Sequence, residues 1–332
     1  MSIERLKKLR HWSVFSFIGP AITDLTGTKE SATKRIRMRR LTDHHMWSGI
    51  CLADRLALLY LVPAALILAF GWNSGFDYRQ NAALNLGLAA IIWITAVYPP
   101  RSYILQSIRA LYPLVLIGVV FVQVGPFARM IYGPSFTFDP LVAEWDAQFF
   151  GLNPHVWMHE VLSGRLWAEF MHFLYVLYFP LLLGGFAFVW LRRRHDYPRF
   201  SFVFLGSFFT FFVVFVLFPA TGPLDYREGL FGSHVIFSEL VDFLFTFGIP
   251  DPGGAFPSSH VGQSVVVLLL LRPLSRPMKA LIVFIIAGIG ISMGYAAVHY
   301  SIDAVAGLPS GVILYYAWDR AYRRLARRHS QG

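Results

Sequence analysis

Apolar residues run along the chain in long blocks that are separated by short polar segments. Eight of these blocks reach, or nearly reach, the roughly 20 residues that a membrane-spanning helix needs. They cover residues 52–71, 82–98, 103–124, 166–191, 200–219, 258–272, 278–297 and 302–319. The sixth block is short for a hydrocarbon layer of about 30 Å. The pattern predicts an all-α, polytopic membrane protein with about eight transmembrane helices.

Composition agrees with this class of protein. Hydrophobic residues make up 56% of the 332 residues and charged residues only 14%, where a soluble domain carries about a quarter. The net charge of +10 lies between apolar blocks and not on one face of a soluble fold, so we expect no nucleic-acid partner. A single cysteine, Cys51, excludes an intramolecular disulfide and a multi-cysteine metal site. His155 and His159 lack a fixed third ligand, which is more typical of surface residues than of a zinc site.

The basic residues predict the orientation of the chain. With eight spans, one side of the membrane carries 25 of the 29 Lys and Arg residues, including those of the N-terminal segment and the C-terminal tail. The other side keeps four arginines, Arg79, Arg129, Arg165 and Arg227, and 12 of the 19 acidic residues. By the positive-inside rule, both termini are expected in the cytoplasm. The short loops and the lone cysteine favour a bacterial inner membrane.

Two polar segments on the outer side carry the candidate chemistry. The first, residues 253–262, leads into the sixth apolar block. Its glycines free the backbone, and Pro257 suits the start of a helix. Ser258 or Ser259 can present a hydroxyl beside the unpaired N–H groups of the first turn, where a phosphate oxygen is readily bound. His260 lies within this turn, close to such an anion.

The second segment, residues 292–303, joins the last two apolar blocks. If it is helical near its end, the i, i+4 spacing lets Asp303 reach His299. A carboxylate bonded to one imidazole nitrogen fixes the tautomer and leaves the other nitrogen free to attack. We therefore assign His299 as nucleophile, Asp303 as its orienting carboxylate and His260 as general acid. This chemistry requires neither a metal nor a cofactor.

The two segments resemble a known family. Phe256-Pro257-Ser258-Ser259-His260 and His299-Tyr300-Ser301-Ile302-Asp303 look like the second and third signature motifs of the type 2 phosphatidic acid phosphatase superfamily. The resemblance implies the same roles for His299, Asp303 and His260, and a core of six membrane helices. The expected core covers residues 103–320, and two additional transmembrane helices precede it over residues 51–102. The charge pattern adds a basic cytoplasmic arm over residues 1–50, which contacts anionic lipid, and a basic cytoplasmic tail over residues 321–332.

The chain departs from the lipid phosphatases of that superfamily in its cations. The lipid phosphatases carry a Lys and an Arg in a first motif, whereas no Lys lies on the outer side of this chain. They also carry an Arg after the Ser that opens the third motif, whereas Met293 follows Ser292 here. A phosphodiester demands fewer cations than a dianionic monoester. The pattern resembles the branch of inositol phosphorylceramide synthase and sphingomyelin synthase. Three further segments resemble that branch: Trp145–Pro154, Phe173–Phe179 and Phe218–Pro223.

The predicted function is transfer of a phospho-headgroup, such as phosphoinositol or phosphocholine, from a phospholipid donor to a lipid hydroxyl such as that of ceramide. It would proceed through a phosphohistidine. Arg227 is the first candidate for binding the phosphate, unless Asp225 pairs with it, and Ser259 and Tyr295 are candidate hydrogen-bond donors. Two alternatives remain: a lipid phosphate phosphatase, in which water replaces the acceptor, and a lipid transporter without turnover.

Overall fold

The computed structural model describes residues 49–70, 78–227, 236–248 and 253–329. The chain divides into two units, residues 1–49 and residues 50–332, and every described helix belongs to the second. The basic arm predicted over residues 1–50 lies outside the described residues except for its last two positions.

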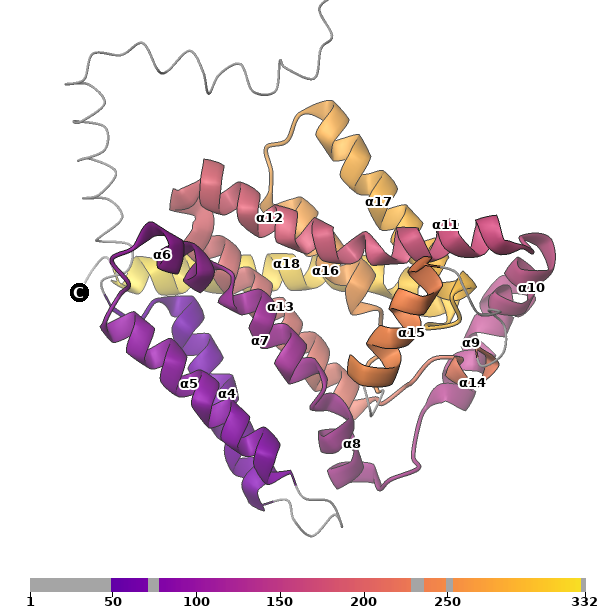
Figure 1. Ribbon diagram of the computed structural model, residues 1–332, viewed down its shortest axis with the longest axis horizontal. Helices are drawn as coiled ribbons and strands as arrows, with labels where there is room; N and C mark the ends of the chain where they lie inside the picture. The colour runs from indigo at the N-terminus through magenta and orange to yellow at the C-terminus, as the bar shows by residue number, and fades with distance from the viewer. Residues whose placement is uncertain (1–48, 71–77, 228–235, 249–252, 330–332) are drawn as a thin grey trace, which may run out of the picture. The chain divides into compact units, whose positions relative to one another are not determined.

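Regular structure within the described residues is helical throughout, as the sequence predicts, and each of the eight apolar blocks contains a helix (Figure 1). The helices are α4 (Leu52–Phe70), α5 (Arg79–Val97), α6 (Tyr103–Ala110), α7 (Tyr112–Phe121), α8 (Val124–Tyr132), α9 (Asp139–Phe150), α10 (Pro154–Val161), α11 (Arg165–Val176), α12 (Tyr178–Arg192), α13 (Tyr197–Leu217), α14 (Leu224–Arg227), α15 (Ile236–Gly248), α16 (Ser259–Leu270), α17 (Arg276–Tyr295) and α18 (Ser301–His329).

Within the described residues, six helical stretches are long and apolar enough to cross a membrane, so the chain is an integral membrane protein. They are α4, α5, the run α6 to α8, the run α11 to α12, the segment Arg194–Leu217 that contains α13, and α17. The other two predicted spans form α16, which has only 12 residues, and α18, which contains Asp303, Pro309 and Asp319. The count of eight spans therefore stays a prediction.

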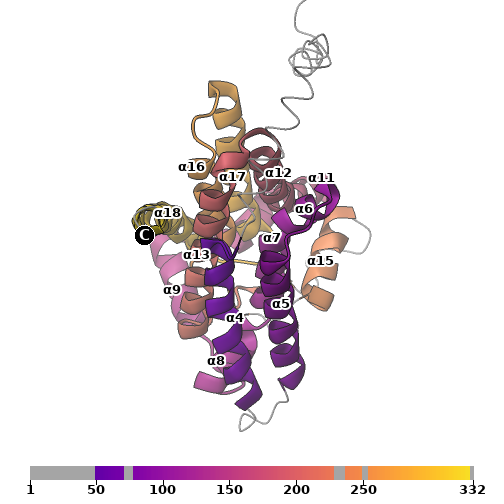
Figure 2. The ribbon, with the colours of Figure 1, turned by 90° about the vertical axis from the view of Figure 1, so that its left-hand side faces the viewer.

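Buried polar pairs attach the two N-terminal helices to the rest of the chain. Helices α4 and α5 lie side by side, and α4 also contacts α13 (Figure 2). Asp54 of α4 forms a buried ion pair with Arg109 of α6, with 2.8 Å between Oδ2 and Nη2. Asn85 of α5 and Gln123 exchange two side-chain hydrogen bonds of 2.9 Å. Such polar contacts join helices in a lipid environment, where apolar surface alone does not select a partner.

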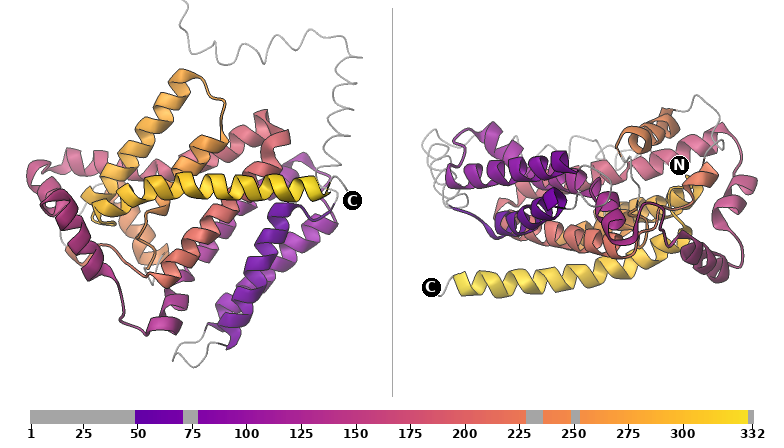
Figure 3. Two further views of the ribbon diagram at one scale, coloured as in Figure 1. Left: turned by 180° about the vertical axis from the view of Figure 1, so that it is seen from behind. Right: turned by 90° about the horizontal axis from the view of Figure 1, so that it is seen from below.

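Helices α16 and α18 approach each other at backbone level, and α18 crosses α16 and α13 in Figure 3. Three glycines, Gly262, Gly307 and Gly311, lie at this crossing. A Cβ atom on Gly307 would lie 2.6 Å from the carbonyl oxygen of Ser258, and one on Gly311 would overlap the carbonyl oxygen of Gly262. The two helices start at the same end of the crossing, because Ser258 lies opposite Gly307 and Gly262 opposite Gly311. Their first turns are consequently neighbours.

We expect Gly311→Ala to lower the melting temperature of the purified protein in detergent by several degrees. The added methyl meets backbone, which cannot rotate away, and such overpacking costs about 1–3 kcal/mol. Gly184→Ala in α12 is the control, since a Cβ there meets nothing within 4 Å. Equal melting temperatures of the two variants in a thermal unfolding assay would contradict the crossing described above.

Candidate active site

The two predicted catalytic segments meet where α16 and α18 begin. His260 lies in the first turn of α16, and His299 lies in the turn that precedes α18. The centroids of the two imidazole rings are 5.4 Å apart, and the ring planes are inclined by 79°. The backbone N–H of Ser258 also donates a 3.0 Å hydrogen bond to the carbonyl oxygen of Asp303, which joins the two segments directly.

His299 is oriented by Asp303. Its Nδ1 lies 3.1 Å from Oδ2 of Asp303, and the same oxygen accepts a 3.0 Å hydrogen bond from the backbone N–H of Tyr300. The side chains of His299 and Asp303 are both buried. With Nδ1 engaged, Nε2 is the nitrogen left for attack on an electrophile. The turn that precedes His299 is tight, and it includes Ala297 in the left-handed region with φ of 52°.

Two tyrosines from the junction of α11 and α12 surround His260. The hydroxyl of Tyr175 lies 3.2 Å from Nε2 of His260, and the ring of Tyr178 lies 4.4 Å from the imidazole between centroids. Nδ1 of His260 is buried and has no hydrogen-bond partner in the described part of the chain. These tyrosines belong to the aromatic segment Phe173–Phe179, which the sequence associates with the site only through a resemblance.

The two serines before His260 lie differently. Ser258 is the N-cap of α16, where its Oγ accepts a 3.4 Å hydrogen bond from the N–H of Val261. Its hydroxyl also contacts Sδ of the buried Met293 at 3.4 Å. Ser259 lines the cavity into which both histidines face. Ser259 is therefore the better placed of the two to meet a ligand.

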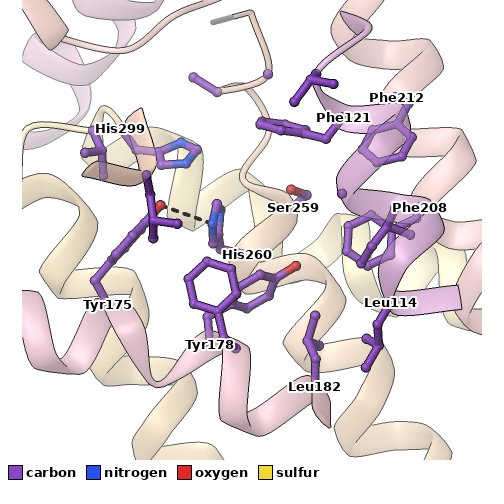
Figure 4. Close-up of a pocket in the computed structure, with 18 of the residues that line it drawn as sticks. Leu114, Phe121, Tyr175, Tyr178, Leu182, Phe208, Phe212, Ser259, His260 and His299 are labelled. Carbon is purple, nitrogen blue, oxygen red and sulfur yellow. Dashed lines mark hydrogen bonds between the residues drawn. The ribbon is translucent and has the colours of Figure 1, made fainter. Parts of the chain in front are cut away.

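A cavity of about 650 Å³ adjoins the histidines (Figure 4). Figure 4 shows His260, His299 and Tyr175 on one side, and Leu114, Phe208 and Phe212 on the other. No Lys, Arg, Asp or Glu is among the described residues that line it. Its volume is typical of ligand pockets, and its apolar wall suits hydrocarbon better than a headgroup. The polar lining residues are Tyr175, Tyr178, Thr221, Ser259, His260 and His299.

Arg227 supports the turn that leads to His299. Its guanidinium donates to the carbonyl oxygen of Ala296, lies 3.1 Å from Nε2 of the buried His172, and forms an ion pair of 2.6 Å with Asp242. Asp242 is thus an acidic partner of Arg227. Arg227 does not line the cavity described above. Its predicted contact with a phosphate stays a prediction.

Tyr295 is held outside the cavity by α10 and its C-cap residue Leu162. Its hydroxyl donates a 3.1 Å hydrogen bond to the carbonyl oxygen of Leu162, and its ring stacks on His159 with centroids 4.4 Å apart. His159 also bonds the carbonyl oxygen of Tyr295 at 2.7 Å. Burial lowers the pKa of His155 and of His159, so both favour the neutral form. The described residues contain no group of three or more His, Cys, Asp or Glu side chains arranged for a metal.

Two carboxylates of α9 reach the site; of these, the sequence indicates Asp146 only as part of the segment Trp145–Pro154, and it gives Asp139 no role. Asp139 accepts hydrogen bonds from the backbone N–H groups of Thr221 and Gly222. Asp146 accepts a 2.7 Å hydrogen bond from the N–H of Ile302 in the first turn of α18. Burial raises the pKa of Asp146 to about 6, and the nearby carboxylate of Asp303 acts in the same direction. The signal available in the sequence was their spacing of seven residues, which places both on one helix face.

Comparison with known proteins adds one match. The family model of the PAP2 superfamily matches residues 141–317, which is more than half of the chain and includes both histidine segments. Comparisons with curated proteins and with solved structures gave no significant match.

We expect Tyr175→Phe to lower turnover about fivefold, because a hydrogen bond to a buried imidazole contributes on the order of 1 kcal/mol and about 1.4 kcal/mol corresponds to a factor of ten in rate. Tyr178→Phe is the matched control, since it keeps the ring that lies against His260. Initial rates in mixed micelles measure both. A Tyr175→Phe protein as active as the Tyr178→Phe protein would show that the hydroxyl has no part in catalysis.

Proposed function

We propose a transfer reaction for this chain, which belongs to the PAP2 superfamily and is an enzyme that acts on phosphate esters. It transfers a phospho-headgroup from a phospholipid to the hydroxyl of a second membrane lipid. The observation that carries this proposal is the His299–Asp303 pair beside His260, at an apolar cavity whose described lining residues include no Lys, Arg, Asp or Glu. Diacylglycerol is the leaving group, and a lipid such as ceramide is the acceptor.

In the first step, Nε2 of His299 attacks the phosphorus of the donor. A P–N bond forms while the P–O bond to diacylglycerol breaks, and protonated His260 donates its proton to the departing oxygen. Asp303 stabilises the positive charge that develops on the imidazole of His299, because its carboxylate already lies at Nδ1. The product of this step is a phosphohistidine diester that retains the headgroup.

In the second step, the acceptor hydroxyl attacks the same phosphorus. Neutral His260 takes the hydroxyl proton, the P–N bond breaks and the electron pair returns to Nε2 of His299. The headgroup then sits on the acceptor lipid, and both histidines are back in their starting states. The burial of His299 and Asp303 limits competition by water for the intermediate.

The charge of the site supports a diester substrate. Met293 stands where the similar lipid phosphatases carry an arginine. It is fully buried and contacts Ser258. A phosphodiester carries one negative charge, and the N-terminal end of α16 supplies partial positive charge to this region. A monoester dianion would require more positive charge than the cavity lining provides. Phosphoinositol and phosphocholine are headgroups of the diester kind.

The basic residues support an active site on the outer face of the membrane. His260 lies at the start of α16, whereas Arg272 follows its end. In the same way, Asp303 lies at the start of α18, and Arg320 to Arg328 lie in its last turns. Because basic residues favour the cytoplasmic side, both termini would be cytoplasmic and the histidines would face outward. A bacterial inner membrane is the location that we propose.

The function is tested with purified protein in mixed micelles. One sample contains phosphatidic acid, and another contains phosphatidylinositol, phosphatidylcholine and fluorescent ceramide. We expect a new fluorescent phospholipid in the second sample and no inorganic phosphate in the first. His299→Ala should lower the rate by roughly 10³-fold or more, because no other group replaces the nucleophile.

His195→Ala is the control, since this histidine is 82% exposed and lies in the turn between α12 and α13. Release of inorganic phosphate from phosphatidic acid without a lipid product would make the protein a phosphatase. Full activity of His299→Ala would rule out a phosphohistidine, and lipid movement without turnover would indicate a transporter.

A further inference from the structure

We propose that Asp139 and Asp146 are positioning residues for catalysis, and that α9 is a brace that fixes the His299–Asp303 pair from outside the cavity. The inference rests on the proposed function. Neither carboxylate lines the cavity, so neither touches the substrate there. Both act on backbone that adjoins His299.

Asp139 acts through the loop that precedes α14. Its carboxylate accepts hydrogen bonds from the N–H of Thr221 at 2.9 Å, from the hydroxyl of Thr221 at 2.6 Å and from the N–H of Gly222 at 2.8 Å. It also bonds the hydroxyl of Thr137. Four donors on one carboxylate leave the loop little freedom to move.

This loop lies against the backbone of the catalytic turn. Gly222 has φ of +83°, and a Cβ atom there would lie 2.5 Å from the carbonyl oxygen of Val298 and 3.3 Å from Cα of His299. The loop and the turn are therefore in contact at backbone level, where there is no side chain to yield. A shift of the loop that Asp139 holds would be transmitted to His299.

Asp146 acts through the first turn of α18. Its Oδ1 accepts a hydrogen bond from the N–H of Ile302, the residue before Asp303. The side chain is 1% exposed, and its Oδ2 has no hydrogen-bond partner in the described part of the chain. A buried carboxylate with an unbonded oxygen costs stability. The benefit consistent with that cost is a fixed start for the helix that carries Asp303.

The two acids lie seven residues apart, so they project from one face of α9. One helix thus holds the turn that contains His299 at two points. Asp139 holds the Thr221–Gly222 loop, which packs against Val298 and His299, and Asp146 holds the first turn of α18. A misplacement of about 1 Å in a reacting group can cost up to about 10²-fold in rate. Loss of either carboxylate should therefore lower kcat and leave KM nearly unchanged.

The test uses full-length protein, with fluorescent ceramide and phosphatidylinositol or phosphatidylcholine as donor. We expect Asp139→Ala and Asp146→Ala each to lower kcat about ten- to a hundredfold, with KM within about twofold of the wild type. Asp146→Asn should retain most of kcat, because the amide oxygen still accepts from Ile302. Asp139→Asn should fall between the wild type and Asp139→Ala, since one oxygen remains for several donors.

Two control variants separate positioning from general loosening. Glu144→Ala removes an exposed carboxylate of α9 that bonds only Gln148 of the same helix among the contacts described, and it should leave kcat unchanged. Asp319→Asn breaks ion pairs with Arg199 and Arg323 at the far end of α18. It should lower the melting temperature but not kcat. If Asp319→Asn lowers kcat as much as Asp146→Ala does, the positioning role is wrong.

Hydrogen exchange measured by mass spectrometry adds a readout that needs no turnover. Asp146→Ala should speed exchange in peptides that cover residues 299–305, and Asp139→Ala in peptides that cover 221–224 and 297–300. Unchanged exchange, or faster exchange with unchanged kcat, would overturn the proposal. If the wild type turns over no lipid, the proposed function fails, and the exchange data alone then decide whether α9 holds the catalytic turn.

Discussion

The glycine contact between α16 and α18 governs the geometry of the site. Because these helices meet at backbone level and start at the same end, the residues at their first turns must be neighbours. The hydrogen bond from the N–H of Ser258 to the carbonyl oxygen of Asp303 is formed across that meeting point. His260 and His299 need no long loop to bring them together, since each lies within one turn of a helix start. Small residues at this helix crossing thus bring the two histidine segments together as well as packing the helices.

Polar groups around the site divide into two sets with different tasks. The cavity side presents imidazole and hydroxyl groups, namely those of the two histidines, Tyr175 and Ser259, beside an apolar wall. The charged groups lie outside the cavity and bond backbone, as Asp139 does at the Thr221–Gly222 loop. In a medium of low dielectric constant, charges next to a substrate would interact strongly with its phosphate. Charges that bond backbone outside the cavity instead hold the segments around His299 in place.

Much of the fold could be predicted from the sequence, because a bilayer requires long apolar helices and these are visible as blocks. Each of the eight predicted blocks is helical, yet α16 has only 12 residues. The contact of His299 with Asp303 was also predicted, from i, i+4 spacing on a helix. It forms although His299 lies in the turn before α18 and only Asp303 lies on the helix. Contacts between segments that are distant along the chain could not be predicted from the sequence. No local pattern links Arg227 to Asp242, and Asp225, which is closer along the chain, was the natural guess.

The contacts that α9 makes with the site could not be predicted from the sequence for the same physical reason. Its acids bond backbone N–H groups, and every residue except proline has one, so nothing in the partner's side chain identifies it. Asp139 bonds residues 82 and 83 positions away, and Asp146 bonds one 156 positions away. Only the period of the two aspartates indicates a shared face. Acidic residues at helical period in a segment between the membrane helices of an enzyme are therefore worth testing as supports of backbone.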